Sequence, residues 1–161
     1  MRSLPHEALP RHIGVILDGN RRWARTNAPG QPLVAGYQAG ADKLCEFVGW
    51  CDELDIPIVT LWVLSTDNLQ RSKADELQPL LQVIDQLVQK LARTGKYRVM
   101  TVGDLELLPP DLAEHFRQAE QTTAGNTGTH INVAVAYGGR HELRDAVRDL
   151  LAEEARKGTS L

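Results

Sequence analysis

The feature that most constrains this fold is a series of short apolar runs, each followed by a longer stretch with helical spacing. The apolar runs are rich in β-branched residues and cover residues 13–17, 56–64, 98–102 and 131–137. Nearly continuous apolarity of this kind is typical of parallel strands buried on both faces of a sheet. Apolar residues three and four apart predict helices over residues 37–51, 77–91, 112–119 and 143–151. This alternation predicts an α/β protein with a mostly parallel sheet, right-handed crossovers and helices on both faces.

Length and charge narrow the class of protein. A chain of 161 residues fits one domain, so we expect residues 1–161 to form a single unit. A net charge of −3 argues against a general nucleic-acid binder, which usually carries a basic face. No run reaches the length of a membrane span, and the first residues lack the apolar centre of a signal peptide. Cys45 and Cys51 are interpreted as buried thiols, so we expect a cytoplasmic protein.

Polar and charged residues gather where the predicted strands end. Asp18-Gly19-Asn20-Arg21-Arg22 follows the first strand, and residues 65–71, STDNLQR, follow the second. Ligands of open α/β sheets bind outside the carboxyl ends of the strands. A carboxylate suits Mg²⁺, and arginines clasp phosphate oxygens. The pattern therefore predicts a metal-assisted anion site, with Gly19 and the following amides as an anion-binding nest.

Simpler interpretations remain open from the residues alone. Asp18-Gly19-Asn20 is also a turn signal, and Asp67-Asn68 is also a helix cap. The nearby arginines also fit a solvated charge cluster, and Trp23 and Trp62 fit the core better than a stacking role. The common dinucleotide, nucleoside-triphosphate and hydrolase motifs do not occur.

Four ordered segments together indicate a family. Residues 12–24, HIGVILDGNRRWA, resemble the opening signature of the cis-prenyltransferases, the undecaprenyl diphosphate synthase family. Residues 36–40, 64–71 and 132–140 resemble the phosphate block, the second-strand block and the fourth-strand block of that family. The wording LSTDNLQR is most similar to the short-chain branch that makes Z-farnesyl diphosphate.

The resemblance implies an Mg²⁺-dependent enzyme that condenses isopentenyl diphosphate with an allylic diphosphate to form a short Z-prenyl diphosphate. It implies that Asp18 holds Mg²⁺ and assists departure of the diphosphate, and that Asn68 lies near the reacting carbons. The substrate-binding residues that it implies are Gly19, Asn20, Arg21, Arg22, Trp23, Tyr37, Ser65, Thr66, Asp67, Leu69 and Arg71. It also implies a homodimer and a peripheral membrane contact for the lipid product.

Three positions depart from the family pattern. Tyr37 stands where the family usually has histidine, Leu33 where it has a phosphate-binding arginine, and Leu69 where it often has an aromatic residue. Tyrosine donates one hydrogen bond but cannot become cationic near neutral pH. These changes leave the preferred allylic substrate open.

The family pattern normally continues for several tens of residues beyond Arg140, with a further strand, an Arg-Thr-Ser-Gly-Glu-type block and a metal-binding glutamate. That part is absent from these residues, so we expect a truncated isoprenyl transferase domain that lacks the last strands and helices. One alternative is a catalytically incomplete fragment or subunit that needs a partner chain for the missing block. Another is an α/β module that binds a different phosphorylated ligand.

Overall fold

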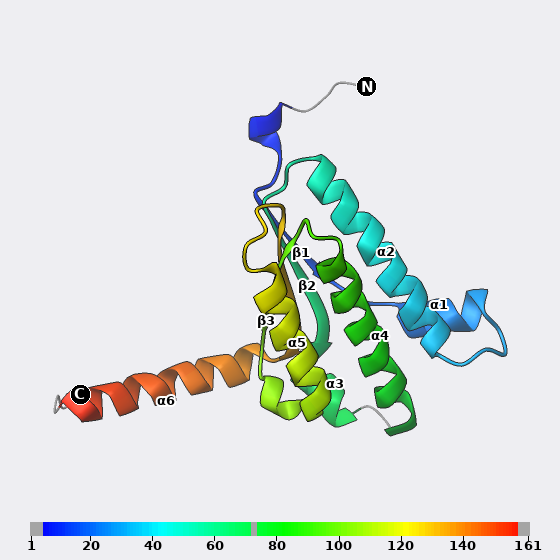
Figure 1. Ribbon diagram of the computed structural model, residues 1–161. Helices are drawn as coiled ribbons and strands as arrows, with labels where there is room; N and C mark the ends of the chain where they lie inside the picture. The colour runs from blue at the N-terminus through cyan, green and yellow to red at the C-terminus, as the bar shows by residue number, and fades with distance from the viewer. Residues whose placement is uncertain (1–4, 72–73, 158–161) are drawn as a thin grey trace.

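The computed structural model describes residues 5–71 and 74–157. The four strands are β1 (His12–Ile16), β2 (Ile58–Ser65), β3 (Arg98–Val102) and β4 (His130–Tyr137). The α-helices are α1 (Asn20–Asn27), α2 (Val34–Glu53), α3 (Thr66–Arg71), α4 (Ala74–Arg93), α5 (Pro110–Thr123) and α6 (Gly139–Lys157). Short 3₁₀ turns η1 (His6–Ala8) and η2 (Leu105–Leu107) complete the described chain. All four predicted strands and all four predicted helices are present (Figure 1).

The strands form one parallel sheet in the order β1-β2-β4-β3. The predicted α/β class with a parallel sheet is therefore confirmed. Ile13 lies beside Val59, Val59 beside Ile131, and Ile131 beside Val99. Because β1 and β2 are neighbours, the segments that follow them emerge at the same edge of the sheet. This topology brings together the two polar segments, although they lie more than 40 residues apart in the sequence.

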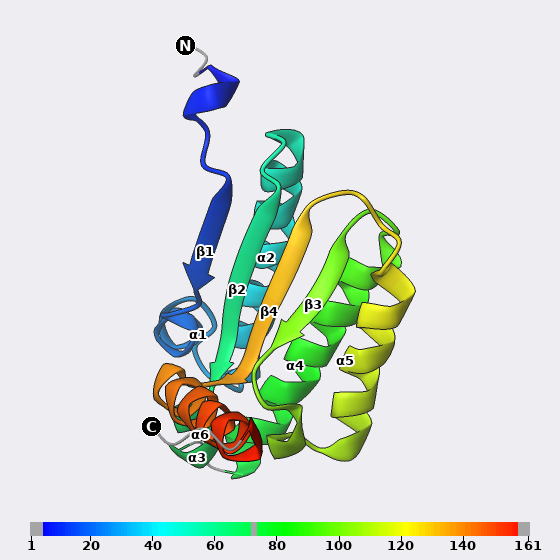
Figure 2. The same cartoon turned by 90° about the vertical axis from the view of Figure 1, so that its left-hand side faces the viewer.

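The core lies between one face of the sheet and helices α2, α4 and α5 (Figure 2). Val48 of α2, Val88 of α4 and Phe116 of α5 are fully buried against inward-facing strand residues such as Val59 and Val133. Burial of this apolar surface is the main term that stabilises such a layer.

The expectation of helices on both faces is not met in the described part of the chain, where these three helices share one face. In β2, Val59, Leu61 and Leu64 are buried while Ile58, Thr60 and Trp62 are only partly buried, an alternation that indicates a sheet covered on one face. Polar residues occupy the uncovered face: Thr60 is hydrogen-bonded to His12 at 2.8 Å, and the Asn132 amide donates to the same hydroxyl at 3.2 Å. The apolar runs suggested burial on both sides because residues such as Ile58, Trp62 and Ala134 interrupt the polar residues of the uncovered face.

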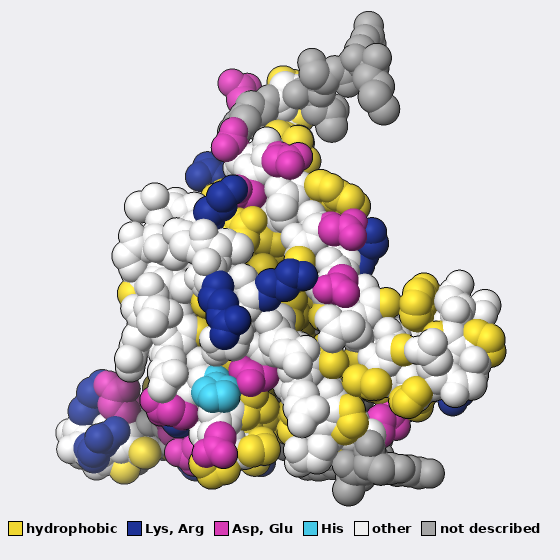
Figure 3. All heavy atoms as spheres, turned by 45° about the vertical axis from the view of Figure 1, so that its right-hand side comes forward, with side chains coloured by type: hydrophobic (Ala, Val, Ile, Leu, Met, Phe, Trp, Pro, Cys, Tyr) yellow, Lys and Arg dark blue, Asp and Glu magenta, His cyan; other side chains and the backbone are white. Residues whose placement is uncertain are grey.

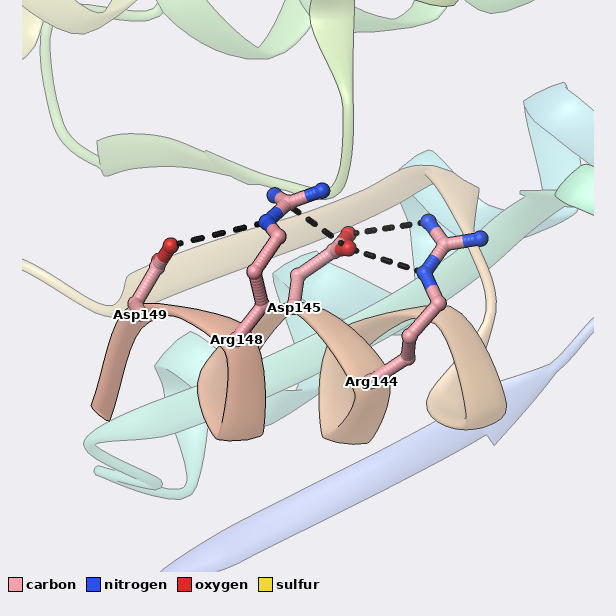
Figure 4. A network of polar contacts seen from close by, with 4 residues as sticks. All are labelled: Arg144, Asp145, Arg148 and Asp149. Carbon is pink, nitrogen blue, oxygen red and sulfur yellow. Dashed lines mark hydrogen bonds and ion pairs between the residues drawn. The ribbon is translucent and has the colours of Figure 1, made fainter. Parts of the chain in front are cut away.

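Helix α6 projects away from the body of the fold (Figure 1). Its predicted apolar stripe exists, but Leu143, Val147, Leu150 and Leu151 are all at least half exposed. Arg144 and Arg148 both pair with Asp145 on this helix, and Arg148 also lies 3.8 Å from Asp149 (Figure 4). Exposed ion pairs of this kind contribute little each, so they support the helix only weakly. Among the described residues, no helix combines the length and apolarity needed to cross a bilayer.

Candidate functional site

A cavity of about 600 Å³ opens where β1 and β2 end. Its wall is built from the segment after β1, from α1, and from residues of α2, β2, α3 and α4. The lining residues are Leu17, Asp18, Gly19, Asn20, Arg21, Arg22, Arg25, Tyr37, Val63, Asn68, Glu76 and Leu80. Three arginines face two carboxylates, so the cavity carries an excess of positive charge although the whole chain is acidic. Such a focused field favours an anionic ligand.

Asp18 lies at the mouth of this cavity. Its side chain is 89% exposed, and its Oδ1 accepts a hydrogen bond from the Gly19 amide at 2.6 Å. Gly19 has a φ of 91°, a left-handed conformation that glycine adopts without a steric penalty. The turn at Gly19 starts α1 and leaves the second carboxylate oxygen of Asp18 toward solvent, 3.8 Å from Arg22. The turn and the candidate ligand role are therefore compatible.

The phosphate block of the sequence has a packing role that the structure makes explicit. A Cβ at Gly36 would lie 2.1 Å from the Asn20 carbonyl oxygen, and one at Gly40 would lie 2.6 Å from Asn20 Oδ1. Real Cβ atoms essentially never come within 3.0 Å of such a neighbour, and at Gly36 the neighbour is backbone. The two glycines thus let α2 pack directly against the start of α1, and this contact holds Asn20 and its neighbours beside the cavity.

The segment after β2 is ordered by Ser65. Its hydroxyl oxygen accepts a hydrogen bond from the Asn68 backbone amide at 3.0 Å, in the manner of a residue that caps a helix. The cap that the sequence assigned to Asp67-Asn68 is thus provided by Ser65, at the end of β2. The Asn68 side chain is exposed and lines the same cavity as Asp18.

Tyr37 and Arg21 meet a carboxylate from another helix. The Tyr37 hydroxyl donates a hydrogen bond to Glu76 Oε1, and Arg21 Nη1 lies 3.8 Å from the same oxygen. Burial first, and then the Glu76 carboxylate, raise the pKa of Tyr37 to about 12. Tyr37 is therefore a neutral hydrogen-bond donor near neutral pH.

The structure brings together seven of the residues implied by the family resemblance. They are Asp18, Gly19, Asn20, Arg21, Arg22, Tyr37 and Asn68. Five other described residues of that set do not line the cavity: Trp23, Ser65, Thr66, Asp67 and Leu69. Arg71 ends α3, but its side chain lies outside the described residues.

Trp23 and Trp62 were both expected to fit the core, and their positions differ from that interpretation. Trp23 is 44% exposed on the polar helix α1, so it does not belong to the core as expected. Trp62 is half-buried on the uncovered face of the sheet and packs edge to face with Tyr137 at 5.5 Å between ring centroids. Thr66 is 5% exposed and lines a different cavity, together with Gly103 and Tyr137.

Sequence reasoning did not assign a site role to several cavity residues. They are Leu17, Arg25, Val63, Glu76 and Leu80. Leu80 belongs to the apolar stripe of the helix predicted over residues 77–91, and Val63 lies in the apolar run 56–64, so the pattern located both residues without assigning them a role. No sequence signal marked Glu76 as a site residue, because a glutamate near a helix start is common and only the fold brings it to Tyr37.

A second polar groove, of about 570 Å³, lies on the outer surface of α4 and α5. Lys90, Arg93, Asp85 and His115 line it, and His115 Nδ1 lies 2.9 Å from Asp85 Oδ2. Figure 3 shows basic side chains and a histidine gathered on this face. The groove is separate from the strand ends, which distinguishes it from the cavity of Asp18 and Asn68.

The fold and the cavity define a class of protein: a parallel α/β protein that presents arginines and a carboxylate where two adjacent strands end. A family model described as putative undecaprenyl diphosphate synthase matches residues 16–160. The chain therefore belongs to the undecaprenyl diphosphate synthase family of cis-prenyltransferases.

Relatives with assigned names agree with this family. The chain is 51% identical over 159 residues to a (2Z,6E)-farnesyl diphosphate synthase of Thermobifida fusca. That match covers 99% of this chain and 61% of the relative. It is 50% identical over 158 residues to isoprenyl transferase 1 of Streptomyces avermitilis, with coverage of 98% and 60%. The chain thus spans about 60% of the length of the curated relatives that it matches.

Solved structures share the fold. Lavandulyl diphosphate synthase of Lavandula x intermedia, crystallised with dimethylallyl diphosphate, superposes with a TM-score of 0.86 at 29% identity. The match covers 94% of this chain and 65% of that one. A probable undecaprenyl diphosphate synthase of Campylobacter jejuni has a TM-score of 0.68 at 24% identity, over 94% of this chain and 64% of that one, and supports the fold alone.

Proposed function

We propose that this chain carries the allylic-diphosphate part of a cis-prenyltransferase active site. The reaction condenses isopentenyl diphosphate with an allylic diphosphate to give a short Z-prenyl diphosphate. The observation that carries the proposal is that Asp18, Arg21, Arg22 and Asn68 line one cavity at the ends of β1 and β2. The names of the Thermobifida fusca and Streptomyces avermitilis relatives support the same reaction class.

The chemistry assigns a task to each group. The allylic C–O bond breaks and leaves a diphosphate, the alkene carbon of isopentenyl diphosphate forms the new C–C bond, and a proton then leaves the resulting cation. Arg21 and Arg22 stabilise the negative charge that develops on the departing diphosphate. Their present partners are carboxylates 3.8 Å away. Both arginine side chains are mostly exposed, and ion pairs this long are weak enough to be exchanged for phosphate oxygens.

Asn68 is proposed to lie beside the reacting carbons. Its amide is a weak base, so a diphosphate oxygen is the better proton acceptor, with Asn68 orienting the substrate. Asn20 would contact the phosphates through the backbone amides of the first turn of α1, because the N-cap residue Gly19 has no side chain to cap them. The Gly19 amide donates to Asp18 Oδ1 and would exchange that partner for a phosphate oxygen. The apolar residues Leu17, Val63 and Leu80 would contact the prenyl group.

Asp18 suits a magnesium ion. Mg²⁺ in phosphate sites is held by one or two carboxylates together with substrate phosphates and water, so a dense cluster of protein ligands is not required. Within the described ranges, no group of three or more potential metal-ligating side chains occurs, whereas Asp18 offers one solvent-facing oxygen at the cavity mouth. When bound, Mg²⁺ would neutralise diphosphate charge. Asp18 would hold it, and Arg22 would share the neighbouring phosphate oxygens.

The proposal extends to the whole protein. Its partners would be isopentenyl diphosphate, an allylic diphosphate and a second copy of the complete chain in a homodimer. Both substrates are charged and water-soluble, which favours a cytoplasmic enzyme with a peripheral membrane contact for the product. The second substrate's diphosphate would bind in the part of the family pattern that follows Arg140, beyond the cavity described above.

The test is an assay with radiolabelled isopentenyl diphosphate and C5, C10 or C15 allylic primers. The complete protein is expected to form a Z-configured product with Mg²⁺, and Asp18→Ala is expected to cut turnover by about two orders of magnitude or more while circular dichroism stays unchanged. Glu46→Gln, which removes an exposed carboxylate of α2, is the matched control and should retain full turnover. Near wild-type turnover in Asp18→Ala would rule out the metal role.

A further inference from the structure

Three side chains from three helices meet at one carboxylate oxygen. Tyr37 of α2 donates a hydrogen bond to Glu76 Oε1, and Arg21 of α1 lies 3.8 Å from that oxygen. Glu76 is near the start of α4, and its side chain is only 19% exposed, whereas that of Arg21 is 63% exposed. Tyr37 is 8% exposed. The carboxylate is thus mostly buried against its hydrogen-bond donor, whereas the arginine side chain is mostly exposed to solvent.

This cluster separates two cavities. Arg21, Arg25, Tyr37 and Glu76 line both the cavity of Asp18 and a second cavity of about 520 Å³. The remaining wall of the second cavity is apolar and consists of Pro32, Leu33, Val34 and Pro79. Glu76 therefore stands at the boundary between a polar, arginine-rich space and an apolar one.

A carboxylate in this position conflicts with a bound diphosphate. Like charges at short range repel, and the cavity otherwise gathers positive charge. Arg21 has five N–H donors, but those that face Glu76 cannot serve a phosphate oxygen at the same time. The Tyr37 hydroxyl has a single hydrogen, which either Glu76 or a phosphate oxygen can accept.

We propose that Glu76 is a positioning residue that occupies Arg21 and Tyr37 while the cavity holds no diphosphate and yields them to the diphosphate when it binds. The inference rests on the proposed function, because it requires an anion at the strand ends. In the absence of diphosphate, the Glu76 carboxylate takes the place of a phosphate oxygen. Glu76 keeps the Arg21 side chain directed toward the cavity and sets the affinity for the diphosphate group. Because the pKa of Tyr37 is raised, its hydroxyl keeps the proton that this exchange needs.

The experiment measures binding of inorganic pyrophosphate by calorimetry in the complete protein, without metal. Glu76→Gln keeps an oxygen for Tyr37 but removes the charge that competes for Arg21. It is expected to tighten pyrophosphate binding about two- to fivefold, the size of an exposed ion pair. In an Arg21→Gln background the same substitution should give a clearly smaller gain, because only the direct repulsion and the competition for Tyr37 remain once Arg21 is absent. Glu46→Gln controls for net charge.

The outcomes are distinct. An unchanged or weaker affinity in Glu76→Gln overturns the inference, as does an equal gain in the Arg21→Gln background or in Glu46→Gln. If the wild-type protein does not bind pyrophosphate, or binds it independently of both Arg21 and Arg22, the proposed anion site itself fails. Should Glu76→Gln unfold, nuclear magnetic resonance of wild-type arginine Nε–H groups decides: pyrophosphate is expected to shift the Arg21 signal, and an unmoved signal overturns the exchange.

Discussion

Gly36 lies directly against the backbone of Asn20: a Cβ at position 36 would be 2.1 Å from the Asn20 carbonyl oxygen. The contact joins α2 to the first residue of α1, and Asn20 lines the candidate cavity. A single missing methyl group thus sets how closely the two helices approach and where the residues after β1 lie. The glycine matters for this close approach, since its own backbone is ordinary helix.

Gly36→Ala is therefore expected to destabilise the protein by about 1–3 kcal/mol, because either α1 or α2 must shift. Gly49→Ala is the matched control in the same helix, where an added Cβ meets nothing within 4 Å. Without a clash, alanine should stabilise the helix by roughly 0.5–1 kcal/mol. Urea unfolding of both variants measures the difference. Equal stabilities for the two variants would contradict the packing role of Gly36.

Alkaline pH should weaken the fold through Tyr37. Its pKa is about 12 in the folded protein, above the ordinary value of 10.0, so the folded state favours the neutral phenol. The contribution is complete below pH 10 and is lost as the pH rises from 10 toward 12. Tyr37→Phe should lose less stability than the wild type over that range, as measured by urea unfolding at each pH. Parallel losses in the two proteins would show that Tyr37 ionises as it does in the unfolded chain.

Sequence patterns predict the individual strands and helices far better than they predict how these elements are arranged. The apolar runs that became β2 and β4, and the stripe from Leu77 to Leu91 that became α4, are long and periodic, so local pattern suffices to find them. Helices α1 and α3 are short and polar, and they exist because Gly19 and Ser65 start them at strand ends. The position of β4 between β2 and β3 depends on contacts that no local pattern records.

The site divides in the same way. The polar segments that contain Asp18 and Asn68 were predicted to meet because each follows an apolar strand, and a parallel sheet places such segments at a common edge. The individual roles of the two residues came from the family resemblance and stay predictions. Glu76 was missed because its role exists only through its contacts with Tyr37 and Arg21. Trp23 was assigned to the core because it is large and aromatic. The residues around it in α1 are polar, however, and the helix buries only Ala24.

The two thiols should react at different rates. Burial raises the pKa of both Cys45 and Cys51, and Lys90 beside Cys45 partly offsets this rise. Cys51 is 2% exposed, whereas Cys45 is half-buried. A disulfide reagent is expected to label Cys45 first, more slowly than free cysteine, and Cys51 only after unfolding, because thiolate and access are both required. Mass spectrometry after timed quenching identifies the site. First labelling at Cys51 would mean that α2 opens in solution.

Acid should destabilise the other end of the sheet through His130, the first residue of β4. Burial, and then the nearby Arg98 charge, lower the pKa of His130 below its ordinary value of 6.5. Its Nε2 is buried and has no hydrogen-bond partner in the described part of the chain, so protonation there adds an uncompensated charge. The folded state binds the proton less readily than the unfolded chain does. The stabilising contribution is therefore present above about pH 6.5 and is lost as the pH falls toward the lower, folded-state value.

His130→Leu should flatten the decline in unfolding free energy between about pH 7 and pH 5, while pyrophosphate affinity at the opposite edge of the sheet stays unchanged. Identical pH profiles for the variant and the wild type would assign the acid sensitivity to other groups.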